Sequence, residues 1–407
     1  MAASRFDVVT IGSATRDVFV RSDLARIMEI SEMQGSTSYL CLDHGGKQNV
    51  SNIFFTTGGG ATNAAAAMAT LGFKVAAAAC VGKDPTAGEI ESELEELKVD
   101  TGMLGRHESE RSGYSVIISS FDGERTVLTY RGASSMLSPE MIDWDRLAAA
   151  RWVYLSSLHG RSAELYLRIA HFCRERGVKL AVNPGSSQFR QGLEGLKDVL
   201  AATSVLLLNR DEAIKLVGST DFRRYVDAGK CTLCGECVKS CPAGIFLREG
   251  DRISVVGEDR CVRCNACVQA CPTRAVLMEP WALNLDEIFR RISEYCPGLI
   301  CVSDGMRGVQ CYDGVARHIM PIFEVPTVCS LGAGDAFGST FVASLLDNPE
   351  DVPRALAWAS ANAASVVTIM GAKYGLLDRP NLTSFLERQG DWRARMRSGS
   401  LGAPEGS

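Results

Sequence analysis

The sequence predicts an α/β protein with a doubly wound, mostly parallel sheet, a small β-lid and an inserted cysteine-rich α+β domain. Three observations support this prediction. Apolar runs alternate with amphipathic stretches over most of the 407 residues, as in chains built from βαβ units. Two stretches break the alternation with strand character alone. A cysteine pattern in the second half occurs twice, thirty residues apart.

The wound domain is predicted element by element from the alternation. Its expected strands are short apolar runs, at residues 6–11, 75–81, 152–155, 179–182, 205–208 and 299–303. Its expected helices have apolar positions at helical spacing, at residues 61–71, 86–97, 163–176, 211–217, 285–295, 334–346 and 352–370. Strands separated by helices of this length favour a parallel sheet with helices on both faces.

The two irregular stretches are residues 18–57 and 112–131. The first has strand character without a clear helix. The second alternates around Asp122-Gly123-Glu124, which is a hairpin signal. Together they are expected to form a lid that closes over a site.

The domain boundaries follow from these patterns. The wound domain is expected to be discontinuous, at residues 1–219 and 279–390, with the insert at 220–278. Residues 245–256, between the two cysteine runs, look like a further hairpin. Residues 391–407 are rich in Gly, Ser and Arg, and are predicted to be disordered.

Composition narrows the classes of partner. The formal net charge is −5, so no basic field for nucleic acid or acidic membranes is expected. No apolar run approaches the ~18 residues of a membrane span, and the N-terminus enters a strand without a signal-peptide core. Seven cysteines outside the repeated pattern are scattered, which favours reduced, buried thiols. The expected location is the cytoplasm.

The repeated cysteine pattern resembles the run that holds two [4Fe–4S] clusters in bacterial ferredoxins. The copies are Cys231-x2-Cys234-x2-Cys237-x3-Cys241-Pro242 and Cys261-x2-Cys264-x2-Cys267-x3-Cys271-Pro272. In such a run three thiolates bind one cube and the fourth cysteine reaches the other. The first cluster would use Cys231, Cys234, Cys237 and Cys271, and the second Cys261, Cys264, Cys267 and Cys241. Paired C-x2-C also suits zinc, but zinc requires no crossing cysteine before a repeated proline.

A glycine-rich turn near the C-terminus is a candidate for phosphate chemistry. Ser330-Leu331-Gly332-Ala333-Gly334-Asp335 opens a long apolar helix. Small residues leave backbone N–H groups free at the positive helix end, where they stabilise charge on a transferring phosphoryl group. The carboxylate that follows can accept the proton of an attacking hydroxyl. A tight strand–helix turn that uses Asp335 only to start the helix is the alternative.

Two further motifs could bind an acceptor. Residues 58–63, Gly-Gly-Gly-Ala-Thr-Asn, precede a helix of small residues, so the backbone can approach a ligand and Asn63 can bond its hydroxyls. Residues 12–17 follow the first strand, and Asp17 could hold substrate hydroxyls. The alternatives are a flexible loop with a helix cap for the first and a surface turn for the second.

A fourth motif, Asn209-Arg210-Asp211-Glu212, follows a buried strand. Asn209 and Glu212 can lie at the carboxyl edge of the sheet, where ligands bind in open α/β folds, and organise Mg²⁺ waters and phosphates. A plain helix start with acidic first-turn residues remains the alternative.

In this order, and with residues 81–84 and 303–309, these motifs resemble the ribokinase-like (PfkB-type) carbohydrate kinases over about 5–217 and 281–386. The resemblance implies transfer of the ATP γ-phosphate to a sugar or nucleoside hydroxyl. It assigns the catalytic base to Asp335 and the anion hole to Gly332, Ala333 and Gly334. It assigns the acceptor to Asp17, Gly59 and Asn63, and Mg²⁺ and phosphate to Asn209 and Glu212. It assigns the nucleotide to Ser303, Gly305, Gly308 and Asn362.

The resemblance also implies a lid and a homodimer formed through it. One departure is that Cys329-Ser330 stands where the family usually has Asp-Thr. The five histidines have no metal spacing and are interpreted as structural or surface residues. Arg131, at the end of the lid, suits either a substrate phosphate or an exposed strand end.

The sequence therefore predicts an ATP-dependent kinase of a sugar, sugar phosphate or nucleoside. Phosphoryl transfer needs no electrons, so the clusters would sense redox state, dock a redox partner or stabilise the insert. The alternative is an electron-transfer or sensor protein on a kinase-derived scaffold. The intact glycine turn, Asn209 and Glu212 favour the kinase, because a scaffold could lose them without cost.

Overall fold

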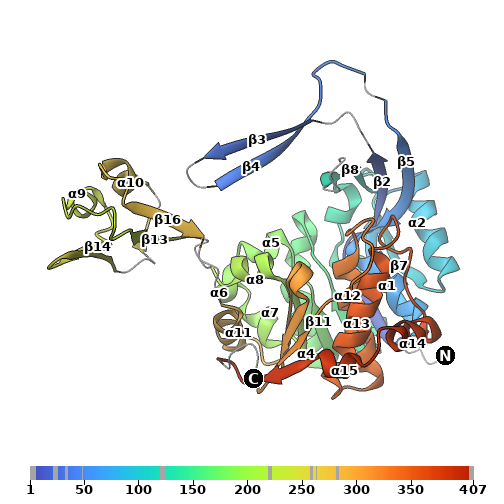
Figure 1. The fold of residues 1–407 in the computed structure, drawn as a ribbon. Coiled ribbons are helices and arrows are strands. Elements are labelled where there is room, and N and C mark those ends of the chain that lie inside the picture. Colours follow the sequence, from blue (N-terminus) through green and yellow to red (C-terminus); the bar gives the residue numbers. More distant parts are fainter. Residues whose placement is uncertain are drawn as a thin grey trace. The chain divides into compact units, whose positions relative to one another are not determined.

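The computed structural model describes residues 6–402 except 22–25, 33–34, 48, 120–124, 219–221, 257–259, 263 and 281–283 (Figure 1). The chain divides into two compact units. The first comprises Met1–Arg26, Leu42–Val217 and Leu285–Ser407, and the second comprises Ile27–Cys41 and Gly218–Asn284.

The first unit contains a ten-stranded sheet. In spatial order its strands are β20 (Arg397–Gly399), β19 (Arg317–Met320), β18 (Val309–Tyr312), β17 (Leu299–Ser303), β12 (Val205–Asn209), β11 (Lys179–Val182), β10 (Trp152–Leu155), β1 (Val8–Ile11), β6 (Val75–Val81) and β7 (Asp100–Arg106). The strands from β17 to β7 pair in parallel, and β18 to β20 add an antiparallel edge. The predicted doubly wound, mostly parallel sheet is confirmed.

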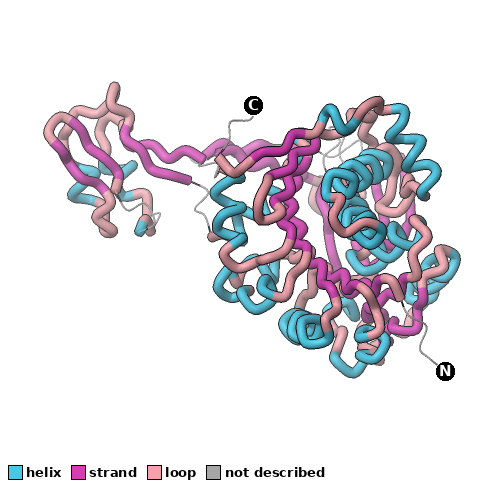
Figure 2. Tube along the Cα trace, turned by 90° about the horizontal axis from the view of Figure 1, so that it is seen from below, coloured by secondary structure: helices cyan, strands magenta, loops and turns pink. Residues whose placement is uncertain are grey.

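Helices cover both faces of this sheet (Figure 2). They are α1 (Gly60–Thr70), α2 (Pro85–Glu96), α3 (Trp144–Ala148), α4 (Leu165–Arg176), α5 (Ser186–Phe189), α6 (Gly192–Gly195), α7 (Lys197–Ala201), α8 (Arg210–Leu216), α11 (Leu285–Ser293), α12 (Ala333–Asp347), α13 (Val352–Val366), α14 (Arg379–Arg388) and α15 (Trp392–Arg395). Every residue of β1 and of β6 is buried. Such continuous burial is expected of parallel strands with helices on both sides.

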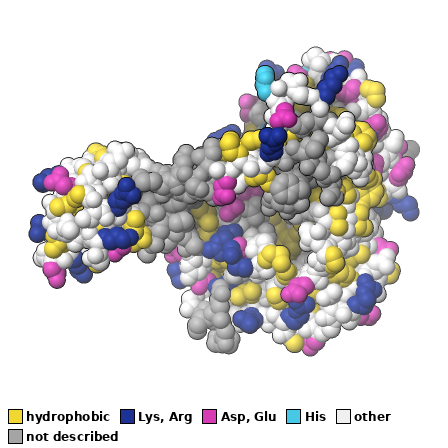
Figure 3. All heavy atoms as spheres, turned by 45° about the horizontal axis from the view of Figure 1, so that its top comes forward, with side chains coloured by type: hydrophobic (Ala, Val, Ile, Leu, Met, Phe, Trp, Pro, Cys, Tyr) yellow, Lys and Arg dark blue, Asp and Glu magenta, His cyan; other side chains and the backbone are white. Residues whose placement is uncertain are grey.

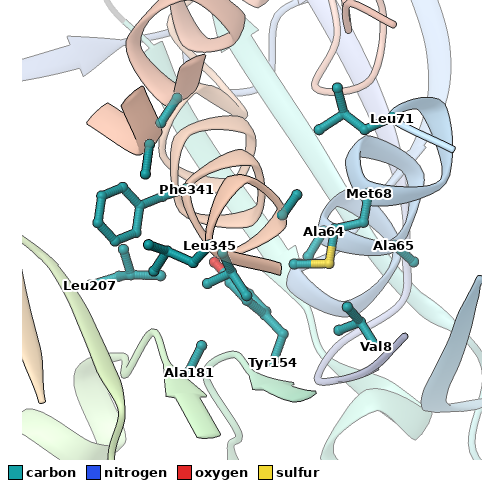
Figure 4. Packing of buried hydrophobic residues seen from close by; sticks show 14 of the residues in the cluster. Val8, Ala64, Ala65, Met68, Leu71, Tyr154, Ala181, Leu207, Phe341 and Leu345 are labelled. Atoms are coloured by element: carbon teal, nitrogen blue, oxygen red, sulfur yellow. The ribbon is translucent and has the colours of Figure 1, made fainter. Parts of the chain in front are cut away.

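One core cluster lies between the sheet and helices α1, α12 and α13. Val8 and Tyr154 from the sheet pack there with Met68 of α1 and Phe341 of α12 (Figure 4). Gly338 permits the approach of α12, because a Cβ there would lie 2.6 Å from the hydroxyl of Tyr154. The small residues of α1 and α12 thus bring two helix starts to the same edge of the sheet.

The strand order reverses beside β1. The chain runs from β1 outward to β6 and β7, then returns to the other side of β1 with β10. Helices on the two sides of such a point diverge and leave a crevice at the carboxyl ends of the strands. The carboxyl ends of β1 and β10 are therefore where this fold is expected to bind a ligand.

The predicted lid is a separate four-stranded sheet in the order β5 (Asn52–Gly58), β2 (Thr15–Arg21), β8 (Gly113–Ser119), β9 (Arg125–Tyr130). Phe19 and Ile117 are buried, whereas Phe55 and Leu128 are half exposed. The chain between β2 and β5 also forms a two-stranded hairpin, β3 (Arg26–Glu32) and β4 (Gly35–Cys41). The tip of the predicted 112–131 hairpin lies outside the described residues.

The predicted disorder of residues 391–407 is wrong as far as residue 402. Trp392 of α15 is buried, and β20 pairs with β19. The backbone N–H of Gly402 donates to the carboxylate of Asp286, which also accepts from Arg317 at 2.6 Å. Both partners of this ion pair are about 95% buried, with 5% side-chain exposure each. The C-terminal segment therefore completes the sheet edge beside α11, where the chain re-enters this unit after the insert.

The described residues of the insert form two short antiparallel ribbons and two helices. The ribbons pair β13 (Phe222–Val226) with β16 (Val276–Pro280) and β14 (Phe246–Glu249) with β15 (Arg252–Val255); the helices are α9 (Glu236–Ser240) and α10 (Ala266–Ala270). The hairpin expected at residues 245–256 is β14–β15.

The two halves of the insert repeat the same backbone. Gly235 and Asn265, thirty residues apart, both have positive φ, at 74° and 57°. Cys241 and Cys271 both have φ −82° and ψ 110°. The duplicated cysteine sequence is therefore a duplicated structure.

Candidate functional site

A cavity of about 210 Å³ lies at the β1–β10 edge of the sheet. Ser13 follows β1 and His159 follows β10, and both line it. The cavity brings together residues from three predicted motifs: Asp17, Gly59, Asn63, Gly332 and Asp335. Motifs far apart in the sequence thus meet where the strand order reverses, as ligand sites do in open α/β sheets.

A hydrogen bond joins the starts of α1 and α12 in this cavity. Asn63 Nδ2 donates to Asp335 Oδ2 at 2.8 Å. The other amide atom, Asn63 Oδ1, is buried and has no partner among the described residues. A buried acceptor without a partner costs free energy, so it is suited to a hydroxyl supplied by a ligand.

Burial raises the pKa of the Asp335 carboxyl, and the hydrogen bond from Asn63 offsets part of the rise. The neighbouring charge of Asp17 raises it further, while Lys373 lowers it. A carboxylate whose pKa lies above its ordinary value is a stronger proton acceptor, which suits a general base.

The turn before α12 has the expected geometry of a phosphate-binding helix start. Gly332 has φ 84°, and a Cβ there would lie 2.5 Å from the Cα of Ala372. Gly334 is exposed, with nothing within 4 Å of its Cβ position. The first N–H groups of a helix have no intrahelical acceptor, so Gly334 and Asp335 present them at its positive end, while the N–H of Ala333 donates to Ser330 O at 3.4 Å.

Asp17 lies on β2 with its carboxylate in the cavity wall. It accepts from Thr15 Oγ1 at 3.0 Å and from the hydroxyl of Ser115. Burial raises the pKa of Asp17 despite these hydrogen bonds. Gly58 must lack a side chain because a Cβ there would lie 2.0 Å from Asp17 Oδ2, and Gly59 has φ 102°. The lid strands therefore hold this carboxylate at a fixed place.

Sequence reasoning missed a buried ammonium group beside this pair of carboxylates. Lys373, after α13, is 7% exposed and contacts Thr57 Oγ1, with Glu93 Oε1 at 3.5 Å. Burial lowers the pKa of Lys373, and the charges of Glu93, Asp17 and Asp335 offset the change. A single lysine in Gly-Ala-Lys-Tyr-Gly carries no motif, so only the folded chain reveals its neighbours.

Asn209 and Glu212 hold each other at the carboxyl end of β12. Asn209 Oδ1 accepts from the backbone N–H of Glu212 at 2.9 Å, and Glu212 Oε2 accepts from that of Asn209 at 2.8 Å. This is a reciprocal capping box, so both residues start helix α8 at the carboxyl end of β12. Burial raises the pKa of Glu212, and the charge of Asp335 adds to the rise.

The loop after β17 carries three residues predicted to contact the nucleotide. Ser303 Oγ donates to Leu208 O at 3.5 Å, and Gly305 and Gly308 have φ 54° and 87°. A Cβ at Gly308 would lie 2.2 Å from Met320 O. Asp304 fixes the loop by accepting from Arg210 at 2.8 Å, which connects it to the helix start at Asn209.

Asn362, also predicted to bind the nucleotide, lies on α13. Its side chain is fully buried on α13. Its Nδ2 donates to Thr340 Oγ1 at 2.7 Å, and its Oδ1 accepts from the N–H of Leu377 at 2.9 Å. Because both ends of the amide are used within the core, direct contact with a nucleotide loses its support.

In the insert, the four cysteines of the second predicted set lie together, and so do three cysteines of the first. The second set, Cys241, Cys261, Cys264 and Cys267, lines one small cavity. In the first set, the thiols of Cys231 and Cys271 raise the pKa of Cys237 by their charge, after burial. Among the described residues, no group of three or more His, Cys, Asp or Glu side chains is arranged to hold a single metal ion. A four-iron cube binds each thiolate at a different iron, so the crossed sets fit it.

Comparison with known proteins identifies both parts. Residues 27–235 and 285–379 match the model of the pfkB family carbohydrate kinases, and residues 223–276 match the 4Fe-4S dicluster domain. The chain belongs to the pfkB family of carbohydrate kinases and carries an inserted 4Fe-4S dicluster domain. It is 25% identical over 316 residues to an ATP-dependent ribose-1-phosphate kinase from Halopiger xanaduensis, covering 78% of this chain and 82% of that protein.

Solved structures share the fold. Arabidopsis thaliana ribokinase, complexed with ribose and ATP, has a TM-score of 0.62 at 17% identity and covers 94% of this chain and 99% of its own. A nucleoside kinase from Methanocaldococcus jannaschii has a TM-score of 0.64 at 15% identity, covering 95% and 100%. The predicted ribokinase-like fold is therefore confirmed.

Replacing Lys373 with Met is expected to move the acid limb of the pH profile of kcat/KM to higher pH. A general base works when deprotonated, so activity falls as pH falls through its pKa. Removing the ammonium raises the pKa of Asp335 and Asp17, which Lys373 lowers. The measurement is the rate from acid to neutral pH with an acceptor that turns over. Lys83→Met, at an exposed lysine, is the control; a limb unchanged in Lys373→Met would contradict this role.

Proposed function

We propose that this protein is an ATP-dependent kinase that transfers the γ-phosphate to a hydroxyl of a sugar, sugar phosphate or nucleoside. The observation that carries the proposal is the meeting of Asp335, Asn63 and Asp17 in one cavity at the start of α12. The relatives, a ribose-1-phosphate kinase, a ribokinase and a nucleoside kinase, support this range of acceptors.

The residues have distinct roles in the proposed transfer. Asp17 and Asn63 Oδ1 bind acceptor hydroxyls. Asp335 accepts the proton as the acceptor oxygen bonds to the γ-phosphorus and the bond to ADP breaks. The N–H groups of Gly332, Ala333 and Gly334 stabilise charge on the transferring group. Lys373 keeps the neighbouring carboxylates ionised.

Nucleotide and Mg²⁺ belong beside the capped start of α8. Ser303, Gly305 and Gly308 would contact ATP, and Asn209 and Glu212 would orient the waters of Mg²⁺. The ion would neutralise charge on the phosphates. Glu212 Oε2 accepts from the backbone N–H of Asn209, and the charge of Asp335 adds to the raised pKa of Glu212.

We propose that the dicluster domain senses redox state or docks a redox partner. A protein in which the kinase fold serves only as a scaffold for electron transfer is the alternative. The raised pKa of Asp335 and the unpartnered Asn63 Oδ1 favour an active kinase, since a scaffold has no need of a buried carboxylate or an unsatisfied amide.

Surface properties support the remaining proposals. Basic and acidic side chains are interspersed over the face drawn in Figure 3, which argues against nucleic acid as a partner. No helix in the described part of the chain is long and apolar enough to cross a membrane. The exposed apolar side chains of Ile53, Phe55 and Leu128 on the lid support a homodimer through it. We also propose a cytoplasmic location for the protein.

Replacing Asp335 with Asn is expected to lower the phosphorylation rate by about 10²–10⁴, because it keeps the side-chain shape and removes the proton acceptor. ATP consumption would be measured against ribose, sugar phosphates and nucleosides with anaerobically purified protein. Asp347→Asn, at the far end of α12, is a matched control. Near-normal turnover by Asp335→Asn would sink the assignment of the base, and no turnover by the natural protein would favour the redox scaffold.

The crossed cysteine sets predict a specific loss of iron. Anaerobically purified protein is expected to contain about eight irons per chain, the sum of two four-iron cubes. Cys271→Ala should damage the cluster of Cys231, Cys234 and Cys237 and keep the other. Cys173→Ala, at a buried cysteine of α4, is the control. Stoichiometric zinc without visible absorbance would rule out the clusters.

A further inference from the structure

One cation lines the cavity without a carboxylate partner in the described part of the chain, and a second lies near His159. Arg131, between β9 and the next helical turn, lines the cavity beside His159 and Ser135. Its guanidinium makes no hydrogen bond or ion pair with another residue of the described part, and burial lowers its pKa. Arg190, at the end of α5, is exposed and lies close enough for its charge, like that of Arg131, to act on His159.

His159 contributes a donor without a charge. Burial, followed by the charges of Arg131 and Arg190, lowers the pKa of its imidazole to about 4. Its Nδ1 lies 2.9 Å from Ser187 Oγ. If that nitrogen accepts from the serine, the second ring nitrogen carries a proton that it can donate into the cavity.

The carboxylates of the same cavity are engaged elsewhere. Asp335 is bonded to Asn63, and Asp17 to Thr15 and Ser115. A neutral sugar would cover a guanidinium and remove its water without replacing the lost interactions. An anionic substituent would pair with it, and the planar fork of arginine matches phosphate oxygens.

We propose that Arg131 and His159 form a subsite for a phosphate ester, so that the acceptor is a sugar phosphate rather than a neutral sugar or nucleoside. This rests on the proposed kinase function and deepens it. Several donors, including the hydroxyls of Thr129 and Ser135, suit the three outer oxygens of a phosphate better than the two of a carboxylate.

The test is calorimetry without ATP, using ribose, ribose 1-phosphate, ribose 5-phosphate and gluconate. The natural protein is expected to bind a sugar phosphate at least tenfold more tightly than ribose. Arg131→Gln should lose at least tenfold for the phosphate and stay within twofold for ribose. Arg388→Gln, at an exposed arginine of α14 bonded to Ser384, should change neither.

Several outcomes would overturn the subsite. These are equal binding of ribose and its phosphates, preference for gluconate, no binding of either phosphate, or an Arg131→Gln variant that matches the Arg388→Gln control. Because the test uses binding alone, it is separate from the turnover assay of Asp335→Asn. Absent turnover with every acceptor would remove the proposed function, whatever the binding preference.

A second inference concerns the insert and rests on a different observation. Arg224, on β13, is 3% exposed and lines the cavity of Cys241, Cys261, Cys264 and Cys267. Its Nη2 donates to Asn265 Oδ1. Its Nε and Nη1 are buried and have no partner among the described residues.

The other half of the insert lacks this cation. The cysteine runs repeat at a spacing of thirty residues, and the residue thirty positions after Arg224 is Ser254. The two halves share their backbone but differ in one buried charge. Burial without a partner is costly for arginine, so its free N–H groups require an acceptor in the cavity.

We infer that Arg224 donates Nε–H and Nη1–H to the cluster held by these four cysteines and makes it the easier of the two to reduce. A cluster that accepts one electron from an external donor gains negative charge, which a nearby cation and its N–H groups stabilise. The two clusters would therefore accept electrons in a fixed order, and the cluster beside Arg224 would be reduced first.

The test is an anaerobic potentiometric titration of the full chain, followed by electron paramagnetic resonance. The natural protein is expected to show two separate midpoints. Arg224→Gln should lower the higher midpoint potential by at least about 59 mV, which is a tenfold change in the one-electron reduction equilibrium. The lower midpoint potential should not change. Arg248→Gln, at an exposed arginine of the insert, is the control.

Arg224→Lys, which keeps the charge, is expected to retain most of the difference between the two midpoint potentials. This variant replaces Arg224→Gln in the test if the glutamine variant loses iron. A single midpoint for both clusters in the natural protein would overturn the inference. So would an Arg224→Gln variant with both midpoints unchanged or equally lowered, or a lysine variant that lowers both equally.

Discussion

The hydrogen bond from Asn63 to Asp335 is the interaction on which the rest of the site depends. It joins the first turns of α1 and α12, which lie 272 residues apart in the sequence. For those turns to meet, both helices must pack closely over the sheet. Alanine-rich α1 and the glycine at position 338 allow this. The packed core of Figure 4 is thus the support for one carboxylate and its amide partner.

The same constraint concentrates charge in a buried place. Asp17, Asp335 and Glu93 surround Lys373, and burial acts against the charged form of Asp17, Asp335 and Lys373. Like charges alone would be strongly unfavourable, and the buried ammonium offsets them. Because Lys373 also contacts Thr57 at the base of the lid, the charges of the cavity and the position of the lid strand β5 depend on one another. The contact between Lys373 and Thr57 therefore stabilises the lid strand β5 beside the cavity.

The insert interrupts the kinase unit between two helices whose first turns are fixed within that unit. It leaves the chain after α8, whose start is held by the capping box of Asn209 and Glu212, and returns before α11, whose start is held by Asp286 and Arg317. The starts of the helices before and after the insert are thus held by interactions within the kinase unit. Within the insert, the two cysteine runs share the same backbone, which suits both to bind a cluster. The buried charge of Arg224, which has Ser254 at the equivalent position, then determines which cluster is reduced first.

The sequence alone determined the features that depend on local pattern. Apolar periodicity specified the wound sheet and its helices, and cysteine spacing specified the crossed sets, because each is encoded by neighbouring residues. The order of short motifs specified which residues share the cavity. It missed the folded C-terminal segment, because Trp392 is buried in the core cluster and β20 pairs with β19, and neither contact is encoded in local composition. It assigned Asn362 to the nucleotide, whereas one end of its amide bonds to Thr340 of α12 and the other to the backbone N–H of Leu377. Lys373, His159 and Arg224 carry no motif at all. Only the tertiary structure decided their roles, because burial and the charges of distant residues, not neighbours in the chain, determine what a single side chain can do.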